Sequence, residues 1–310
     1  MTDKTDKTDK IMLIIDGNSL INREYYGMPR LTAKNGLYTN AILGFINKLI
    51  KYTNQLNPDC AAAAFDLPAP TFRHLEYFGY KANRRGMPDE LAAQLPYVKE
   101  VCGIFGFSVI SQEGYEADDI LGTIAKKYEG KTYIITGDRD SFQLISDNVT
   151  VLYCSNAAVI EYTKQKISED YNLEPKQLID VKALMGDSSD EIPGVFGIGE
   201  KTALNLIREN KTLDFVYKNL ENGTLRITSS TKQKLINGKK DAYMSRRLAE
   251  IYCDVPVKTE VFIKKTHTDK NKLYEFCKNL ELFSVIKKLD LTADADTNEQ
   301  LDIFDIFNSI

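Results

Sequence analysis

Short apolar runs that end in an aspartate recur through the first half of this chain. IMLII precedes Asp16, CAAAAF precedes Asp66, and TYIIT with one glycine precedes Asp138. Apolar runs of this length, separated by stretches with helical spacing, predict strands that alternate with helices. Such alternation is typical of βαβ units, which build a mostly parallel sheet flanked by helices. The sequence therefore predicts an α/β domain over residues 11–180.

Further segments extend this predicted sheet. FSVIS at 107–111 predicts another strand, and helical spacing over 88–106 (PDELAAQLPYVKEVCGIFG) predicts one helix. VTVLYC at 149–154 and AVIEY at 158–162 are separated by a short turn, which favours an antiparallel pair at the sheet edge.

The remainder of the chain has mainly helical spacing, including the long segments 230–254 and 273–290. We expect a helical subdomain over residues 181–290. The polar repeat at 1–10 predicts a disordered leader, and the final segment 291–310 predicts an acidic flexible tail.

Acidic residues cluster at the predicted strand ends and in the loops beyond them. In open α/β sheets the active site lies outside the carboxyl ends of the strands. Carboxylates gathered there repel one another unless cations neutralise them, and oxygen ligands without His or Cys favour Mg²⁺ or Mn²⁺. The pattern predicts a metal-dependent phosphoryl-transfer site. The nine candidate ligands are Asp16, Asp66, Glu116, Asp118, Asp119, Asp138, Asp140, Asp187 and Asp190.

Each acid taken alone also has a structural interpretation. A single Asp after a strand commonly caps a loop or helix, and Glu116, Asp118 and Asp119 could complement the dipole of the helix that they begin. Three strand ends that each carry an Asp, together with three acidic clusters, favour the metal site.

Composition excludes several other classes of protein. The leader lacks the apolar core of a signal peptide, and no stretch approaches the roughly 20 apolar residues of a membrane span. Five scattered cysteines without a CxxC pair predict reduced thiols in a cytoplasmic protein. Two histidines argue against a zinc site or a Ser/His/Asp triad. The net charge of −4 is uninformative, because the last twenty residues hold five acids and no Lys or Arg.

The segment 67–100 combines basic and aromatic residues. Such mixtures track a phosphate backbone and stack unpaired bases. The alternative is a solvated loop whose aromatic rings pack on the sheet, and neighbouring metal-binding acids favour the DNA-binding interpretation. The residues concerned are Arg73, Lys81, Arg84 and Arg85, with Phe72, Tyr77, Phe78 and Tyr80.

A glycine-rich turn precedes the predicted helix GEKTALNLI. It nearly matches a P-loop from Gly194, but Glu200 separates Gly199 from Lys201 and no strand precedes it. We interpret it as a helix–hairpin–helix type turn whose free N–H groups bind a DNA phosphate. The alternative is a glycine-rich helix connection.

Taken together, these motifs resemble the 5′-nuclease domain of bacterial DNA polymerase I, within the flap endonuclease family. The resemblance covers residues 11–290 and rests on DGNSLINREYY, FDLPAPTFRHLEYFGYKANRRGMPDEL, EADDILGT, TGDRDSFQL and LMGDSSDEIPGVFGIGEKTA. It implies a central nuclease sheet, an arch at about 67–100 and a helix–two-turn–helix motif. One departure is Asn18, where the family pattern has a small hydroxyl residue, and we expect little consequence.

The resemblance also implies functions for individual residues. Asp16, Asp66, Glu116, Asp118 and Asp119 match the first metal site; Asp138, Asp140, Asp187 and Asp190 match the second metal region. Tyr80, Lys81 and Arg84 match residues beside the scissile phosphate. The DNA-binding residues implied are Arg23, Arg73, Arg85, Gly194, Gly197, Gly199, Lys201 and Thr202, and the glycine turn commonly holds K⁺.

The resemblance implies a monomeric structure-specific 5′ nuclease, a flap endonuclease and 5′-3′ exonuclease, that uses two or more Mg²⁺ or Mn²⁺ ions about 4 Å apart on branched DNA. Primer removal and repair are the expected setting. The alternatives are a non-catalytic junction-binding protein and a ribonuclease of the small nuclease fold. Whether the chain is free-standing or a polymerase fragment stays open. In the tail, Gln300, Leu301, Ile303 and Phe304 are similar to a peptide that binds the sliding clamp.

Overall fold

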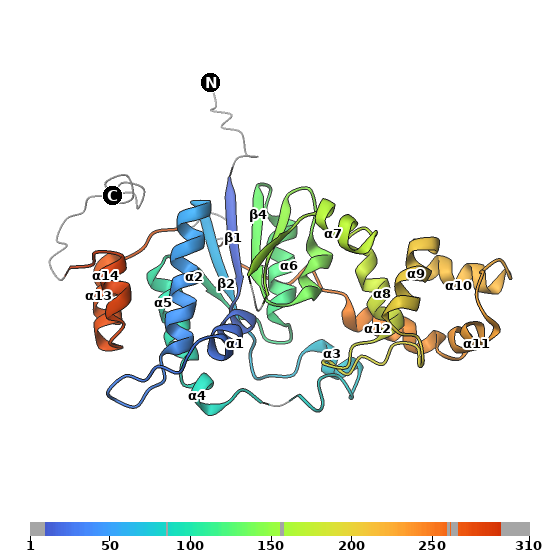
Figure 1. Cartoon of the computed structure of the whole chain (residues 1–310), viewed down its shortest axis with the longest axis horizontal. Helices are drawn as coiled ribbons and strands as arrows, with labels where there is room; N and C mark the ends of the chain where they lie inside the picture. The colour runs from blue at the N-terminus through green and yellow to red at the C-terminus, as the bar shows by residue number, and fades with distance from the viewer. Residues whose placement is uncertain (1–9, 85, 156–157, 259–260, 262–265, 293–310) are drawn as a thin grey trace, which may run out of the picture.

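The computed structural model describes residues 10–84, 86–155, 158–258, 261 and 266–292, and its centre is one six-stranded sheet (Figure 1). The strand order is β3-β2-β1-β4-β5-β6. β1 to β5 pair in parallel, and β6 pairs antiparallel with β5, as the sequence predicts. The strands are β1 (Ile11–Asp16), β2 (Cys60–Ala64), β3 (Ser108–Ile110), β4 (Lys131–Thr136), β5 (Val149–Cys154) and β6 (Val159–Tyr162).

The central strand is buried on both faces, which explains its continuous apolar sequence. Leu13 and Ile15 face one helical layer, while Met12 and Ile14 face the other. The first layer contains α1 (Gly17–Gly27), α2 (Asn40–Leu56) and α5 (Leu95–Ile104); the second contains α6 (Ala117–Lys127), the 3₁₀ segment η2 (Arg139–Leu144) and α7 (Lys164–Tyr171).

Two helices that the sequence predicts as continuous are interrupted. The predicted helix at 88–106 is divided into α4 (Asp89–Ala92) and α5, because Pro96 takes its place in the first turn of a new helix. The segment 230–254 contains α11 (Ser229–Asn237) and α12 (Lys239–Ala249), which meet at Gly238. A side chain on Gly238 would lie 2.8 Å from the Val195 Cγ1 atom, so glycine permits this close approach.

The helical subdomain has its own apolar core. Leu184, Leu206, Tyr217 and Leu235 are buried together there. Figure 1 shows its helices gathered at one end of the sheet, beside α7. They are α8 (Gln177–Met185), α9 (Glu200–Asn210), α10 (Leu213–Glu221), α11 and α12.

The last two described helices lie elsewhere. α13 (Lys270–Asn279) and α14 (Phe283–Lys288) are at the opposite end of the molecule, beside α5 and α2 (Figure 1). Leu273 and Phe276 belong to the same buried cluster as Leu13 of β1. The chain thus returns to the α/β body, whereas the sequence analysis grouped these helices with the helical subdomain. Among the helices of the described residues, none combines the length and apolar character needed to cross a membrane.

Candidate active site

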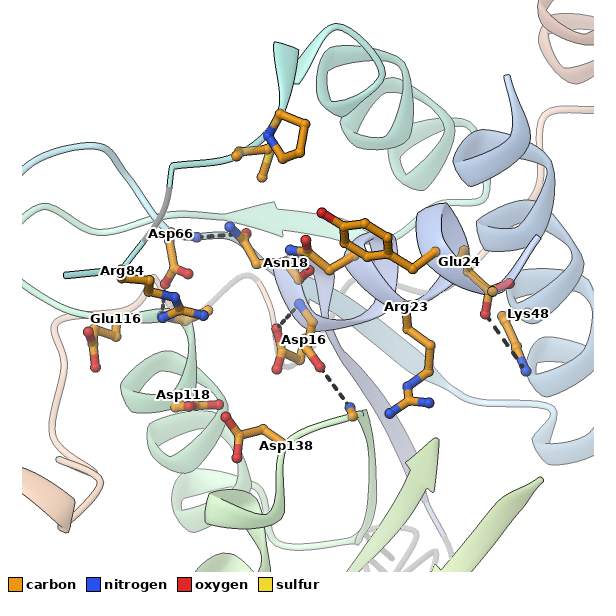
Figure 2. A pocket seen from close by; sticks show the side chains of 18 of the residues that line it. Asp16, Asn18, Arg23, Glu24, Lys48, Asp66, Arg84, Glu116, Asp118 and Asp138 are labelled. Atoms are coloured by element: carbon orange, nitrogen blue, oxygen red, sulfur yellow. Dashed lines mark hydrogen bonds and ion pairs between the residues drawn. The ribbon is translucent and has the colours of Figure 1, made fainter. Parts of the chain in front are cut away.

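A cavity of about 1590 Å³ opens at the carboxyl ends of the central strands (Figure 2). In chain order, β2 and β3 extend the sheet to one side of β1, and β4 then lies on the other side of β1. Such a switch point leaves a crevice between neighbouring strand ends. Five predicted acids line the cavity, together with Lys81, Arg84 and Arg23: Asp16, Asp66, Glu116, Asp118 and Asp138.

Backbone and hydroxyl groups hold the first two aspartates in place. Asp16 ends β1, where its Oδ1 accepts from the Ser19 N–H at 2.9 Å and its Oδ2 from the Thr136 hydroxyl at 2.8 Å. Asp66 accepts from the Ala117 N–H at 2.7 Å. The Asp66 N–H in turn donates to the Asn18 Oδ1 at 3.1 Å. Asn18 therefore positions an acid of the cavity, a function that the sequence analysis did not predict.

Burial and mutual repulsion of these carboxylates favour a bound cation. Asp118 Oδ1 is buried without a hydrogen-bond partner among the described residues. Burial and then the charges of Asp16 and Asp138 raise the pKa of Asp118 well above its usual value. Burial and the charge of Asp66 also raise the pKa of Asp16, to about 7. Figure 2 shows Asp118 and Asp138 pointing toward one another. An oxygen-only donor set with a buried, unpaired oxygen fits a hard divalent ion.

Glu116 is surrounded by side-chain donors, two of which are basic. It accepts from Lys81 Nζ at 2.8 Å, from the Tyr80 hydroxyl at 3.0 Å and from Arg73 at 3.1 Å. Burial opposes ionisation, but the charges of Lys81 and Arg73 outweigh it and lower the pKa of Glu116. Glu116 is therefore ionised and fixed at the beginning of α6.

Arg73 and Asp119, a predicted DNA-binding residue and a predicted metal ligand, are bound to one another. Arg73 is 2% exposed and makes two bonds of 2.8 Å to the fully buried Asp119 carboxylate. It also donates to the carbonyls of Leu248 and Glu250. Asp119 further accepts from the Tyr252 N–H at 2.8 Å. In this arrangement both Asp119 oxygens already accept hydrogen bonds, and Arg73 is buried against them.

Tyr80 contacts the same acid. Its side chain is buried, it meets the His74 ring edge-on at 5.2 Å, and its hydroxyl donates to Glu116. Tyr80 therefore helps to position Glu116.

The other aromatic residues of the arch differ in exposure. Phe78 is 97% exposed, whereas Phe72 packs near Tyr115 and Tyr252. The packing of Phe72 fits the structural interpretation of this segment, whereas Phe78 is free of such packing and stays a candidate for binding bases.

The remaining acids form a distal set beside the cavity: Asp140, Asp187 and Asp190. One oxygen from each lies within 4.8 Å of the others. Lys182, on α8, contacts both Asp140 and Asp187, and Lys81 Nζ lies 3.7 Å from Asp190. Asp138 and Asp140 lie between the two acid sets, because Asp138 faces the cavity and Asp140 contacts Lys182.

Two predicted basic residues, Arg84 and Arg23, line the cavity. Arg84 is exposed, and Figure 2 shows its guanidinium beside Asp66. Its charge and that of Lys81 partly offset the burial that raises the pKa of Asp66. Arg23 lines the same cavity, close to Gly137. The predicted Arg85, and the tail residues Gln300, Leu301, Ile303 and Phe304, lie outside the described residues.

The glycine-rich turn begins a helix as predicted. Gly194 and Gly197 have φ of +61° and +80°, a region that favours glycine. Gly199 immediately precedes α9 and makes no side-chain cap, so Lys201 and Thr202 lie in an uncapped first turn. Lys201 is exposed. The Gly197 carbonyl accepts from Lys234 Nζ at 3.0 Å.

Comparison with known proteins agrees with this geometry. Residues 11–172 match the 5′-3′ exonuclease N-terminal resolvase-like domain, and residues 173–298 match the 5′-3′ exonuclease C-terminal SAM fold. The chain belongs to the 5′-3′ exonuclease family. The family match extends through both the sheet and the helical part.

Relatives of this 5′-3′ exonuclease chain include longer proteins. It is 43% identical over 289 residues to DNA polymerase I of Caldicellulosiruptor bescii, covering 91% of this chain and 34% of that protein. It is 36% identical over 300 residues to DNA polymerase I of Bacillus subtilis, covering 94% and 34%. The chain thus spans about a third of the length of these relatives.

Solved structures share the fold. A zinc-bound T5 5′-exonuclease superposes with a TM-score of 0.65 at 21% identity, covering 88% of this chain and 99% of that one. The catalytic core of Rad2, solved with a DNA substrate, has a TM-score of 0.58 at 19% identity, covering 88% of each chain. These likenesses establish the 5′-nuclease fold for the exonuclease-family chain.

Three positioning residues of this exonuclease-family site were missed from the sequence. Asn18, Thr136 and Lys182 each contact a cavity or distal carboxylate. Asn18 and Thr136 lie within two residues of strand ends, which is the available signal for them. Lys182 is a basic residue in the last turn of α8, just before the acidic loop.

Proposed function

We propose that this chain is a structure-specific 5′ nuclease that hydrolyses phosphodiester bonds of branched DNA, as a flap endonuclease and 5′-3′ exonuclease. The observation that carries the proposal is the cavity in which Asp16, Asp66 and Asp118 face Lys81 and Arg84. Carboxylates for cations and fixed basic groups for phosphate are the two parts that phosphodiester hydrolysis requires.

Mg²⁺ is the cofactor that we propose for this site, held by Asp16, Asp66, Asp118 and Asp138, with Glu116 beside them. When bound, divalent ions there would activate water and stabilise the attacking and leaving oxygens of an in-line displacement. The unpaired Asp118 oxygen and the raised pKa values of Asp16 and Asp118 support this assignment.

Lys81 and Arg84 would bind the scissile phosphate and offset the charge that develops on it. Lys81 is held on both sides, because its ammonium contacts Glu116 and its backbone N–H donates to the Asp190 carbonyl at 3.1 Å. Its φ of +52° is a conformation that this bond maintains. The Lys81 ammonium is therefore presented at a fixed place in the cavity, as charge stabilisation in the transition state requires.

DNA would also be bound outside the cavity in which hydrolysis takes place. The uncapped first turn of α9, with Lys201 exposed, suits a duplex phosphate. Phe78 at 97% exposed and Leu75 at 84% exposed offer apolar surface to unpaired bases. A branched substrate with both duplex and single strand would engage the two surfaces together.

The decisive experiment is cleavage of a labelled 5′-flap DNA with Mg²⁺ or EDTA. We expect cutting with Mg²⁺ alone, and its abolition in Asp66→Ala with flap binding retained, since affinity comes mainly from phosphate contacts. Asp89→Ala, an exposed aspartate of α4, is the matched control and should cut normally. Normal cutting by Asp66→Ala, or cutting in EDTA, would contradict the proposal. Single-stranded RNA tests the ribonuclease alternative.

Finer assignments rest on sequence and family resemblance. We propose a monomer that removes primer-containing flaps in the cytoplasm, with K⁺ at the glycine turn. The segment Gln300–Phe304 is proposed to bind a sliding clamp through its apolar residues, with modest affinity because a short segment must order on binding. Removing residues 298–310 should abolish clamp capture while flap cleavage on naked DNA persists.

A further inference from the structure

The distal carboxylates already surround a cation that belongs to the protein. Lys182 Nζ lies 2.5 Å from Asp140 Oδ1 and 2.6 Å from Asp187 Oδ2. The Lys182 side chain is 11% exposed, and those of Asp140 and Asp187 are 23% and 19% exposed. The ammonium therefore occupies the position between these two oxygens at which a divalent ion would bridge them.

This ammonium opposes the effect of burial on the pKa of both neighbouring carboxyls. Burial alone would raise the pKa of Asp187, but bonds from Lys182 and Ser189 outweigh it and lower the pKa to about 2. Asp140 has a second acidic neighbour, and burial followed by the charge of Asp138 raises its pKa to about 6 despite Lys182. Three carboxylates within 4.8 Å of one another would repel strongly without such a cation.

The cavity acids lack an equivalent partner. Lys81 pairs with Glu116 and Asp190, and Lys182 with Asp140 and Asp187; within the described residues neither lysine makes a salt bridge with Asp16, Asp66 or Asp118. Asp118 even has a buried oxygen without a hydrogen bond there. The two acid sets thus differ in kind, since one depends on an external cation and the other contains its own.

We propose that Lys182 is a built-in counter-cation that keeps the distal set from binding divalent ions tightly in the free protein. The inference rests on the proposed metal-dependent function and deepens it by assigning the two acid sets different metal affinities. A divalent ion and the Lys182 ammonium exclude one another between Asp140 and Asp187, because like charges at contact distance repel. Tight binding in the absence of DNA is confined to the cavity acids.

The test is titration of the DNA-free protein with Mn²⁺, followed by calorimetry. Lys182→Met should gain a class of sites bound about tenfold or more tightly than any distal binding in the wild type. Adding Asp187→Asn to Lys182→Met should remove that class. Lys176→Met, an exposed lysine just before α8, is the matched control and should leave the isotherm unchanged. Identical isotherms for folded Lys182→Met and the wild type would overturn the proposal.

A second variant keeps the test decisive if Lys182→Met does not fold. Asp187→Asn in the wild-type background should leave tight Mn²⁺ binding unchanged, whereas Asp118→Asn should weaken it. Loss of a tight Mn²⁺ ion in Asp187→Asn would show that the distal set binds metal despite Lys182. These isotherms involve no DNA, so a wild type that failed to cut flaps would defeat the proposed function without altering this result.

Discussion

At the scale of single residues, the availability of a carboxylate to a metal ion depends on whether a basic side chain already binds it. Asp119 and Asp118 are neighbours on α6, yet Asp119 is enclosed by Arg73 while a buried Asp118 oxygen has no partner among the described residues. Adjacent acids therefore have different functions: one stabilises the fold, and the other is available to a cation.

Arg73→Met should lower the free energy of unfolding by about 3–5 kcal/mol, because Asp119 would be left as a buried charge without its partner. Arg247→Met is the control, since Arg247 is exposed and lies 3.8 Å from Glu76, and should change stability by less than about 1 kcal/mol. Urea unfolding followed by circular dichroism measures both. Equal, small changes would mean that Arg73 contributes no more than a surface ion pair.

Such pairings are beyond sequence reasoning because the partners are distant in the chain. Arg73 and Asp119 are 46 residues apart, and Lys182 and Asp140 are 42 apart. The acidic pattern predicts which residues gather at the strand ends. Which of them is neutralised internally is decided by tertiary packing.

At the scale of elements, the strands were predicted well because each is a short apolar run with a polar residue at its end. Helix boundaries were predicted less well, since Pro96 and Gly238 act through the local chain geometry and a contact with Val195. The helical signal itself is the same on both sides of each break.

Two lysines on different elements are expected to act separately, Lys81 in phosphodiester hydrolysis and Lys201 in duplex binding. Lys81→Ala should slow single-turnover flap cleavage by about 10²-fold or more, through lost stabilisation of charge in the transition state. Lys201→Ala, at the start of α9, should instead weaken duplex binding and reduce the slope of log affinity against log salt by about one. Rapid-quench kinetics and fluorescence anisotropy measure the two effects. Identical profiles for both variants would refute this division.

At the scale of the whole molecule, helix α13 packs against the α/β body that contains the first strand. Helix α13 contributes Leu273, Phe276 and Cys277 to the core that also contains β1, and Phe276 meets Tyr97 of α5 edge-on at 6.4 Å. The periodicity of α13 predicted a helix correctly. It carried no information on which body that helix covers, because an apolar stripe specifies only that some partner exists.

Phe276→Ala should destabilise the protein by about 3–5 kcal/mol, since it opens a cavity beneath the sheet. Phe283→Ala on α14 is the control, because Phe283 is 60% exposed, and should cost less than about 1 kcal/mol. Differential scanning calorimetry compares the two. A tolerated Phe276→Ala would indicate that α13 is dispensable for the α/β body.

The return of α13 to the sheet also orders events during biosynthesis. β1 leaves the ribosome early, whereas its cover in α13, and the Leu248 and Glu250 carbonyls that hold Arg73, are made much later. At about 5–20 residues per second, the apolar face of the sheet waits on the order of ten seconds or more for its cover. A nascent chain therefore holds the acids without the architecture that arranges them. We therefore expect the site to be assembled only after α12 and α13 have been synthesised.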